Sequence, residues 1–130
     1  MNINERGEMA ASLKAGGQCN CCQAVTKVLA DLTDVDETAL HQLSAGFAAG
    51  MGCMEATCGA LIGANIILGL KTKGNGTVKL SRELLSKFKE KCGAITCKDL
   101  KGVETGKVLC ECPDCVKNAV LALNEVLPLE

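Results

Sequence analysis

Hydrophobic side chains recur along this chain at intervals of three and four residues, which is the spacing of one face of an α-helix. The pattern is clearest in 78–93, where Leu80, Leu84 and Phe88 are separated by charged residues and Gly93 ends the segment. Two other segments carry the same kind of apolar face: 21–32 with Val25, Val28, Leu29 and Leu32, and 113–127 with Val116, Val120, Leu123 and Leu127. The sequence therefore predicts three amphipathic helices in these segments.

Weaker patterns predict further helices between these three. In 34–50, Asp34 and Glu37 have the spacing of a capping box, and the stripe Leu40, Leu43 and Phe47 follows before glycines interrupt it. Another helix is expected from about Thr57 through the apolar run "GALIGANIILGLKT". Gly59 and Gly63 lie four residues apart in this run, on one helical face, and would let a neighbouring helix approach closely.

The remaining segments complete an all-α prediction. Residues 4–14 predict a loosely packed N-terminal helix within 1–15, and 96–102 predicts a short helical turn. No run of alternating hydrophobic and polar residues is long enough to predict a strand. We therefore expect a small helical bundle of five to six helices with Gly-rich loops, forming a single Cys-rich redox domain over residues 1–130.

Composition narrows the function classes. The net charge is −1 with dispersed basic residues, and the chain has two Phe but no Tyr or Trp, so we expect no nucleic-acid partner. The N-terminal segment has charges in place of the apolar core of a signal peptide, and the longest apolar run is too short to span a membrane. We therefore expect a cytoplasmic protein with no membrane association.

Ten cysteines are the outstanding feature of the composition. In a reducing compartment, clustered cysteines more often bind metal or carry out redox chemistry than form structural disulfides. Four of them stand at predicted helix starts, namely Cys21, Cys58, Cys97 and Cys112. Unpaired N–H groups and the helix dipole at such positions favour thiolate over thiol, which suits a metal ligand or a reactive thiol.

The residues leave three kinds of chemistry open. Four thiolates can bind an iron–sulfur cluster or zinc. Thiol–disulfide exchange without a cofactor is the second, through Cys112 and Cys115, Cys53 and Cys58, or Cys92 and Cys97, since each pair has a short spacing. The third is a non-catalytic thiol-rich module that binds metal. A nucleophilic hydrolase is not expected, because His41, the one histidine, lies within a predicted helix.

Four motifs resemble the C-GCAxxG-C-C family of redox-active proteins: "NCCQAV" (20–25), "GMGCMEATCGALIGA" (50–64), "KCGAITCKDLKG" (91–102) and "CPDCV" (112–116). The four signature cysteines of that family map to Cys21, Cys58, Cys97 and Cys112. One departure is Ala56, where the family usually has Glu. The haem-binding Cys-x-x-Cys-His motif found in the related split-Soret cytochromes c is absent from this sequence.

The resemblance implies an iron–sulfur cluster of unknown nuclearity held by the four signature cysteines, and electron transfer or redox sensing as the function. Other cysteines exceed the signature and could add ligands: Cys19, Cys22, Cys53, Cys92 and Cys115. Cys110 is expected to have neither role. We further expect an anaerobic source, an unknown redox partner protein and a possible homodimer; whether any reaction is catalysed is left open.

Overall fold

The chain is all-helical. A computed structural model describes residues 1–129, and this range contains seven α-helices and no strand. The helices are α1 (Ile3–Ala15), α2 (Cys21–Leu29), α3 (Glu37–Leu43), α4 (Gly59–Thr72), α5 (Thr77–Cys92), α6 (Cys97–Lys101) and α7 (Cys112–Val126). Short 3-10 turns cover Ala30–Leu32 and Ala45–Phe47, and a π-helical segment covers Gly50–Met54. The all-α prediction is confirmed, but seven helices replace the predicted five to six, because the segments near 1–15 and 96–102 both form full helical turns.

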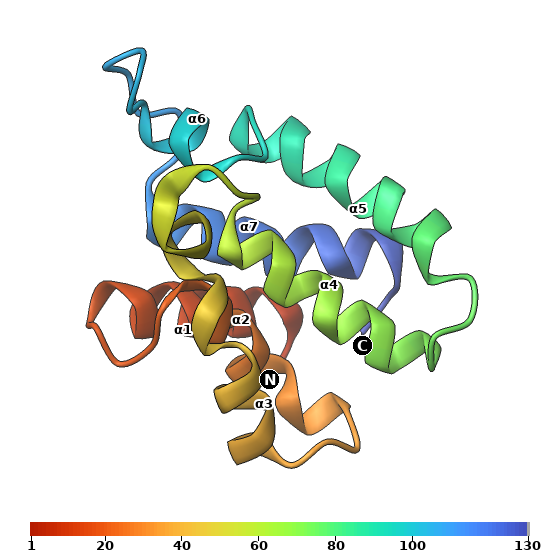
Figure 1. The fold of residues 1–130 in the computed structure, drawn as a ribbon. Coiled ribbons are helices and arrows are strands. Elements are labelled where there is room, and N and C mark those ends of the chain that lie inside the picture. The colour runs from red at the N-terminus through yellow and green to blue at the C-terminus, as the bar shows by residue number, and fades with distance from the viewer. Residues whose placement is uncertain (130) are drawn as a thin grey trace.

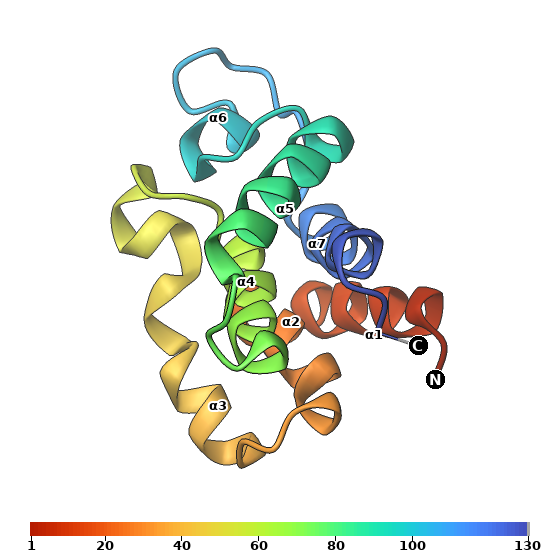
Figure 2. The same cartoon turned by 90° about the vertical axis from the view of Figure 1, so that its right-hand side faces the viewer.

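The central element is α7, which contacts α1, α2, α4 and α5. Figures 1 and 2 show α7 lying between α5 on one side and α1 on the other. The apolar faces predicted for 21–32, 78–93 and 113–127 supply much of the core, and Val25, Leu84, Phe88, Val120 and Leu123 have no exposed surface. Each such side chain contributes about 1.5–3 kcal/mol by leaving water.

Helix α1, which we expected to pack loosely, contacts both α7 and α2 and buries Ile3, Gly7 and Ala10. Small residues bring it close to α7, so that a Cβ on Gly7 would lie 3.2 Å from the Cγ of Lys117. The Arg6 guanidinium donates hydrogen bonds to the carboxylate of Asp31, 2.6 Å away at the nearer oxygen. The N-terminal helix is therefore part of the bundle.

Helix α3 corrects two details of the sequence prediction. Its N-cap is Asp36, whose carboxylate accepts a hydrogen bond from the Ala39 N–H at 3.0 Å, so Asp34 does not form the predicted capping box. Leu40 is buried, but Leu43 is 58% exposed, because α3 ends at this residue and a 3-10 turn redirects the chain. In the described range, no helix is both long and apolar enough to cross a lipid bilayer.

Candidate functional site

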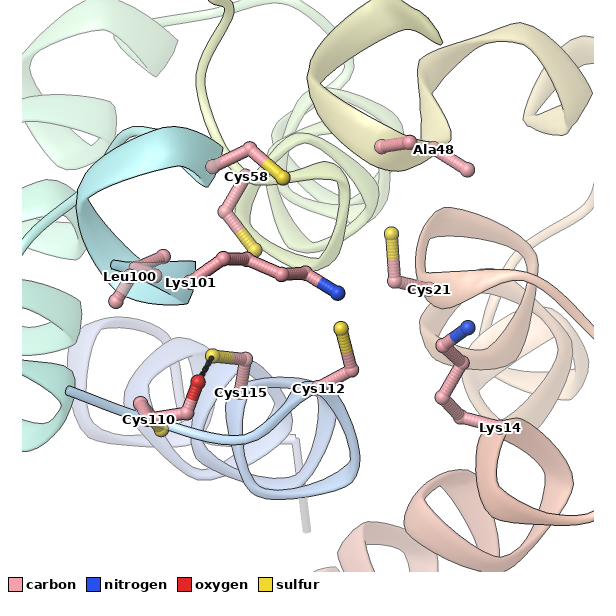
Figure 3. A pocket seen from close by; sticks show the side chains of 11 residues that line it. Lys14, Cys21, Ala48, Cys58, Leu100, Lys101, Cys110, Cys112 and Cys115 are labelled. Atoms are coloured by element: carbon pink, nitrogen blue, oxygen red, sulfur yellow. Dashed lines mark hydrogen bonds between the residues drawn. The ribbon is translucent and has the colours of Figure 1, made fainter. Parts of the chain in front are cut away.

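A cavity of about 100 Å³ lies where the starts of α2, α4, α6 and α7 meet. Within the described part of the chain, six cysteines line it: Cys21, Cys58, Cys97, Cys110, Cys112 and Cys115. Figure 3 shows the side chains of Cys21, Cys58 and Cys112 pointing toward one space from different elements. The structure therefore brings the four predicted ligands to one cavity, although they lie far apart in the sequence.

Cys21 is positioned by the cap of α2. Asn20 is the N-cap, and it forms a reciprocal pair of hydrogen bonds with Gln23, at 2.9 and 3.2 Å. Its amide nitrogen also donates to the Ala45 carbonyl at 3.1 Å, which ties the start of α2 to the segment that continues to Ala48 at the cavity. Since a capping box fixes where a helix begins, Asn20 fixes the location of Cys21.

Cys58 and Cys97 are placed side by side by a short backbone pairing. The Cys58 N–H donates to the Ile95 carbonyl at 2.7 Å, and the Cys97 N–H donates to the Ala56 carbonyl at 3.0 Å. These bonds form an isolated antiparallel bridge just before α4 and α6 begin. Cys58 is then the N-cap of α4 and Cys97 the first residue of α6, so two helix starts are joined through their preceding residues.

Cys112 is the first residue of α7 and Glu111 is its N-cap, so this helix begins one residue before the predicted range 113–127. The Lys101 amine forms a hydrogen bond with the Cys112 sulfur, and this contact raises the pKa of Lys101. Figure 3 shows the Lys101 amine extending between Cys58 and Cys112, with Lys14 on the far side of Cys21. Two lysines thus add positive charge to a site rich in thiols.

The pKa values of Cys21, Cys58 and Cys97 do not shift in one direction, contrary to the uniform lowering expected at helix starts. The pKa of Cys58 is lowered to about 7 by the neighbouring Cys115 thiol, with a further contribution from the N–H groups of Ala60 and Leu61. Burial raises the pKa of Cys21 and of Cys97, because the cost of removing a charge from water exceeds the effect of the helix end. Metal binding at these sulfurs would therefore release protons.

The cavity is covered by a strained segment. Ala49, Met51 and Met54 have positive φ angles of 53°, 60° and 66°, a conformation that side chains with a Cβ rarely adopt. Gly50 also has a positive φ, and a Cβ on it would lie 2.8 Å from the Cβ of Cys97. Cys97 donates to the thioether sulfur of Met54 at 3.6 Å, so this methionine packs directly on a cavity thiol.

Cys19 and Cys22 are buried and Cys53 is exposed, and none of the three lines the cavity. Two cavity cysteines, Cys110 and Cys115, also form a triad with Cys92, in which the three sulfur atoms lie within 4.8 Å of one another. All ten cysteines are free thiols. The structure places Cys110 at the cavity and in the triad, and the expectation that it has no role as a ligand stays a prediction. The spacing Cys-x-Cys-x-x-Cys at 110–115 is the sequence signal for this grouping.

Comparison with known protein families identifies the family to which this chain is similar. The family described as "Putative redox-active protein (C_GCAxxG_C_C)" matches residues 19–126, which is most of the chain and includes all six cysteines of the cavity. The chain belongs to this C-GCAxxG-C-C family. No curated protein and no solved structure matches it. The resemblance predicted from the four motifs is confirmed.

The structure shows why two positions of the C-GCAxxG-C-C motif, Gly59 and Gly63, are occupied by glycine. A Cβ on Gly59 would lie 2.5 Å from the sulfur of Cys21 and 2.8 Å from the Phe47 carbonyl. A Cβ on Gly63 would lie 2.8 Å from the Cys22 carbonyl. Both glycines therefore let α4 approach the start of α2, and Gly59 leaves the space that the Cys21 sulfur occupies.

Proposed function

We propose that this protein transfers electrons or senses redox state through an iron–sulfur centre held by Cys21, Cys58, Cys97 and Cys112. The observation that supports the proposal most strongly is that these four thiols, from four helix starts, line one cavity. The proposal is also supported by membership of a redox-active family. The electron partner, a homodimer and a cytoplasmic location remain predictions.

The donor set fits such a centre. Thiolates are the usual ligands of iron–sulfur clusters, and soft sulfur ligands disfavour hard ions such as Mg²⁺ and Ca²⁺. Such a centre would supply reversible one-electron chemistry. The protein would contribute the ligands, the N–H groups at the start of α4, and the positive charge of Lys101 and Lys14, which offsets the negative charge of thiolates.

Anaerobic purification followed by metal analysis tests the proposal. We expect visible absorbance, iron and acid-labile sulfide in the wild-type protein, and loss of all three in Cys21→Ser and Cys112→Ser. Cys22→Ser is the matched control for Cys21→Ser, because Cys22 is the adjacent residue of α2 and is equally buried but does not line the cavity. Cys53→Ser is an exposed control.

Three results would contradict the proposal. A protein that binds zinc in place of iron, or that retains its iron when Cys21 and Cys112 are replaced, would refute the assignment of the centre or of its ligands. A colourless protein with ten titratable thiols, in which one pair oxidises reversibly, would instead support disulfide chemistry.

Thiol–disulfide exchange is the second candidate, and one observation favours a specific pair. The neighbouring Cys115 thiol lowers the pKa of Cys58 to about 7, so a nucleophilic thiolate lies near a second thiol. The predicted pair Cys112 and Cys115 is less favourable, since Figure 3 shows their sulfurs pointing in different directions. In this alternative, Cys58→Ser and Cys115→Ser would each abolish the reversible oxidation.

A further inference from the structure

The triad of Cys92, Cys110 and Cys115 gathers thiols from separate elements. Cys92 is the last residue of α5, Cys110 precedes α7, and Cys115 lies in the first turn of α7. Their sulfur atoms all lie within 4.8 Å of one another, which is close to the separation of sulfurs that share one metal ion. None of the three belongs to the four-cysteine set of the proposed iron–sulfur centre. Cys110 and Cys115 also line the cavity of that centre, whereas Cys92 does not.

The triad has polar support of its own. The amide nitrogen of Asn118 donates to the Cys92 sulfur at 3.5 Å and lies 3.9 Å from the Cys110 sulfur. An amide that donates to two sulfurs at once would hold metal-bound thiolates in a fixed orientation. Asn118 is one turn beyond Cys115 on α7, so the same helix supplies a ligand and the group that orients the other two.

The triad also has access to solvent. A second, outer groove is lined by Lys91, Cys110 and Asn118, among others, and it shares Cys110 with the four-cysteine cavity. Cys110 is partly exposed, whereas Cys92 and Cys115 are buried. A metal ion could therefore reach Cys110 from the groove and meet the two buried sulfurs behind it, without passing through the cavity that holds Cys21 and Cys97.

We propose that Cys92, Cys110 and Cys115 form a second metal site, which takes a single thiophilic d¹⁰ ion. Three sulfur ligands select a soft ion. Cu(I) is satisfied by a three-sulfur set, whereas structural zinc almost always has four protein ligands, so Cu(I) is the ion that the site fits better. This site goes beyond the proposed function and does not depend on it, because it uses none of the four ligands of the iron–sulfur centre.

Metal titration of the full-length chain tests the second site under anaerobic conditions. Cys21→Ser and Cys97→Ser are introduced together, so that the four-cysteine set is incomplete, and Cu(I) or Zn(II) is added in competition with a chromophoric chelator. We expect one equivalent of Cu(I) to bind with three sulfur ligands, as read by X-ray absorption. Adding Cys110→Ser should weaken the binding by more than about 100-fold, and Asn118→Leu by about 10–100-fold.

Cys53→Ser in the same background is the control that removes a thiol outside both sites, and it should leave the affinity unchanged. Cys110 is chosen because it is only partly buried, so its replacement should not unfold the chain. Tight binding of Zn(II) that Cys110→Ser abolishes would support the site with zinc as its ion. Binding of neither ion, or binding that Cys110→Ser leaves intact, would overturn the proposal.

A separate measurement distinguishes this proposal from that of the iron–sulfur centre. Cys92→Ser in the otherwise wild-type chain should retain iron and acid-labile sulfide, because Cys92 is not a ligand of that centre. Loss of iron in a folded Cys92→Ser protein would show that the triad belongs to the first centre. It would overturn the second site and revise the ligands of the iron–sulfur centre, but it would leave the iron–sulfur chemistry itself standing. Absence of iron from the wild-type protein would refute the first centre and leave the Cu(I) titration unaffected.

Discussion

Gly63 offers the sharpest test of how α4 packs against α2. In Gly63→Ala, the added Cβ would lie 2.8 Å from the Cys22 carbonyl oxygen and 3.1 Å from the Cβ of Val25. Gly69 provides a matched control in the same helix, because a Cβ there would meet nothing within 4 Å. The two substitutions make the same chemical change in one helix, and only one of them forces two helices apart.

We expect the two substitutions to change the free energy of unfolding in opposite directions. Replacing Gly by Ala inside a helix contributes up to about 1 kcal/mol through backbone propensity, so Gly69→Ala should stabilise the protein by about 0.5–1 kcal/mol. Gly63→Ala gains the same amount, but α2 must retreat by roughly 0.6 Å to restore ordinary contact, and such overpacking typically costs about 1–3 kcal/mol. We expect a net loss of about 1 kcal/mol, and a difference of about 2 kcal/mol between the variants.

Urea denaturation of the reduced protein, followed by far-UV circular dichroism, measures both free energies of unfolding. The two variants should have the same dependence on urea concentration, so that a shift in midpoint reports stability alone. Because a retreat of α2 would carry Cys21 away from Cys58, Gly63→Ala should also retain less iron than Gly69→Ala. If Gly63→Ala were as stable as Gly69→Ala, the close approach of the two helices would not constrain the fold.

Three further predictions test the surroundings of the site. Asn20→Ala should cost about 0.5–2 kcal/mol of stability and lower the iron content, whereas Asn2→Ala, which removes the capping box of α1, should cost a similar amount and leave the iron content unchanged. Lys101→Gln should lower the midpoint potential of the centre by about 40 mV if the charge contributes about 1 kcal/mol, and a potentiometric titration with no shift would contradict the role of Lys101. Hydrogen bonding to Arg6 lowers the pKa of Asp31, so at pH values above the ordinary pKa of Asp this pair should stabilise the protein by less than about 1 kcal/mol. The difference in free energy of unfolding between wild type and Asp31→Asn should vanish as the pH falls through the lowered pKa.

The local features of the site could be predicted from the sequence. Cys21 follows a capping asparagine, and Cys112 precedes a proline, which is favoured in the first turn of a helix. Helix starts depend mainly on such neighbouring residues, so all four positions could be located to within two residues. The apolar faces of α2, α5 and α7 could also be predicted, because apolar residues recur every three and four positions in each of these segments.

The sequence separation of the four cysteines could not predict that their helix starts meet at one cavity. Cys58 and Cys97 meet because of two backbone hydrogen bonds between segments about forty residues apart, and backbone groups carry no signal in the sequence. The triad was missed for a related reason: Cys92 stands at the end of α5, and only the packing of α5 on α7 brings it to Cys115. The pKa values were mispredicted at Cys21 and Cys97, where burial by tertiary neighbours outweighs the local helix end.

The backbone conformation of residues 49–54, just before α4, explains why this segment contains two glycines and three other residues with positive φ angles. Three residues with a Cβ adopt positive φ angles within 49–54, and each such conformation costs about 1–3 kcal/mol. A loop needed only to connect α3 and α4 could avoid this cost with an extended conformation. Here the backbone bends tightly enough to place Ala49 at the cavity, Gly50 against Cys97 and the Met54 sulfur on the same cysteine. Packing of this segment against the cavity cysteines offsets the strain. The glycines and the residues with positive φ angles are therefore explained by the position of the segment beside the cavity.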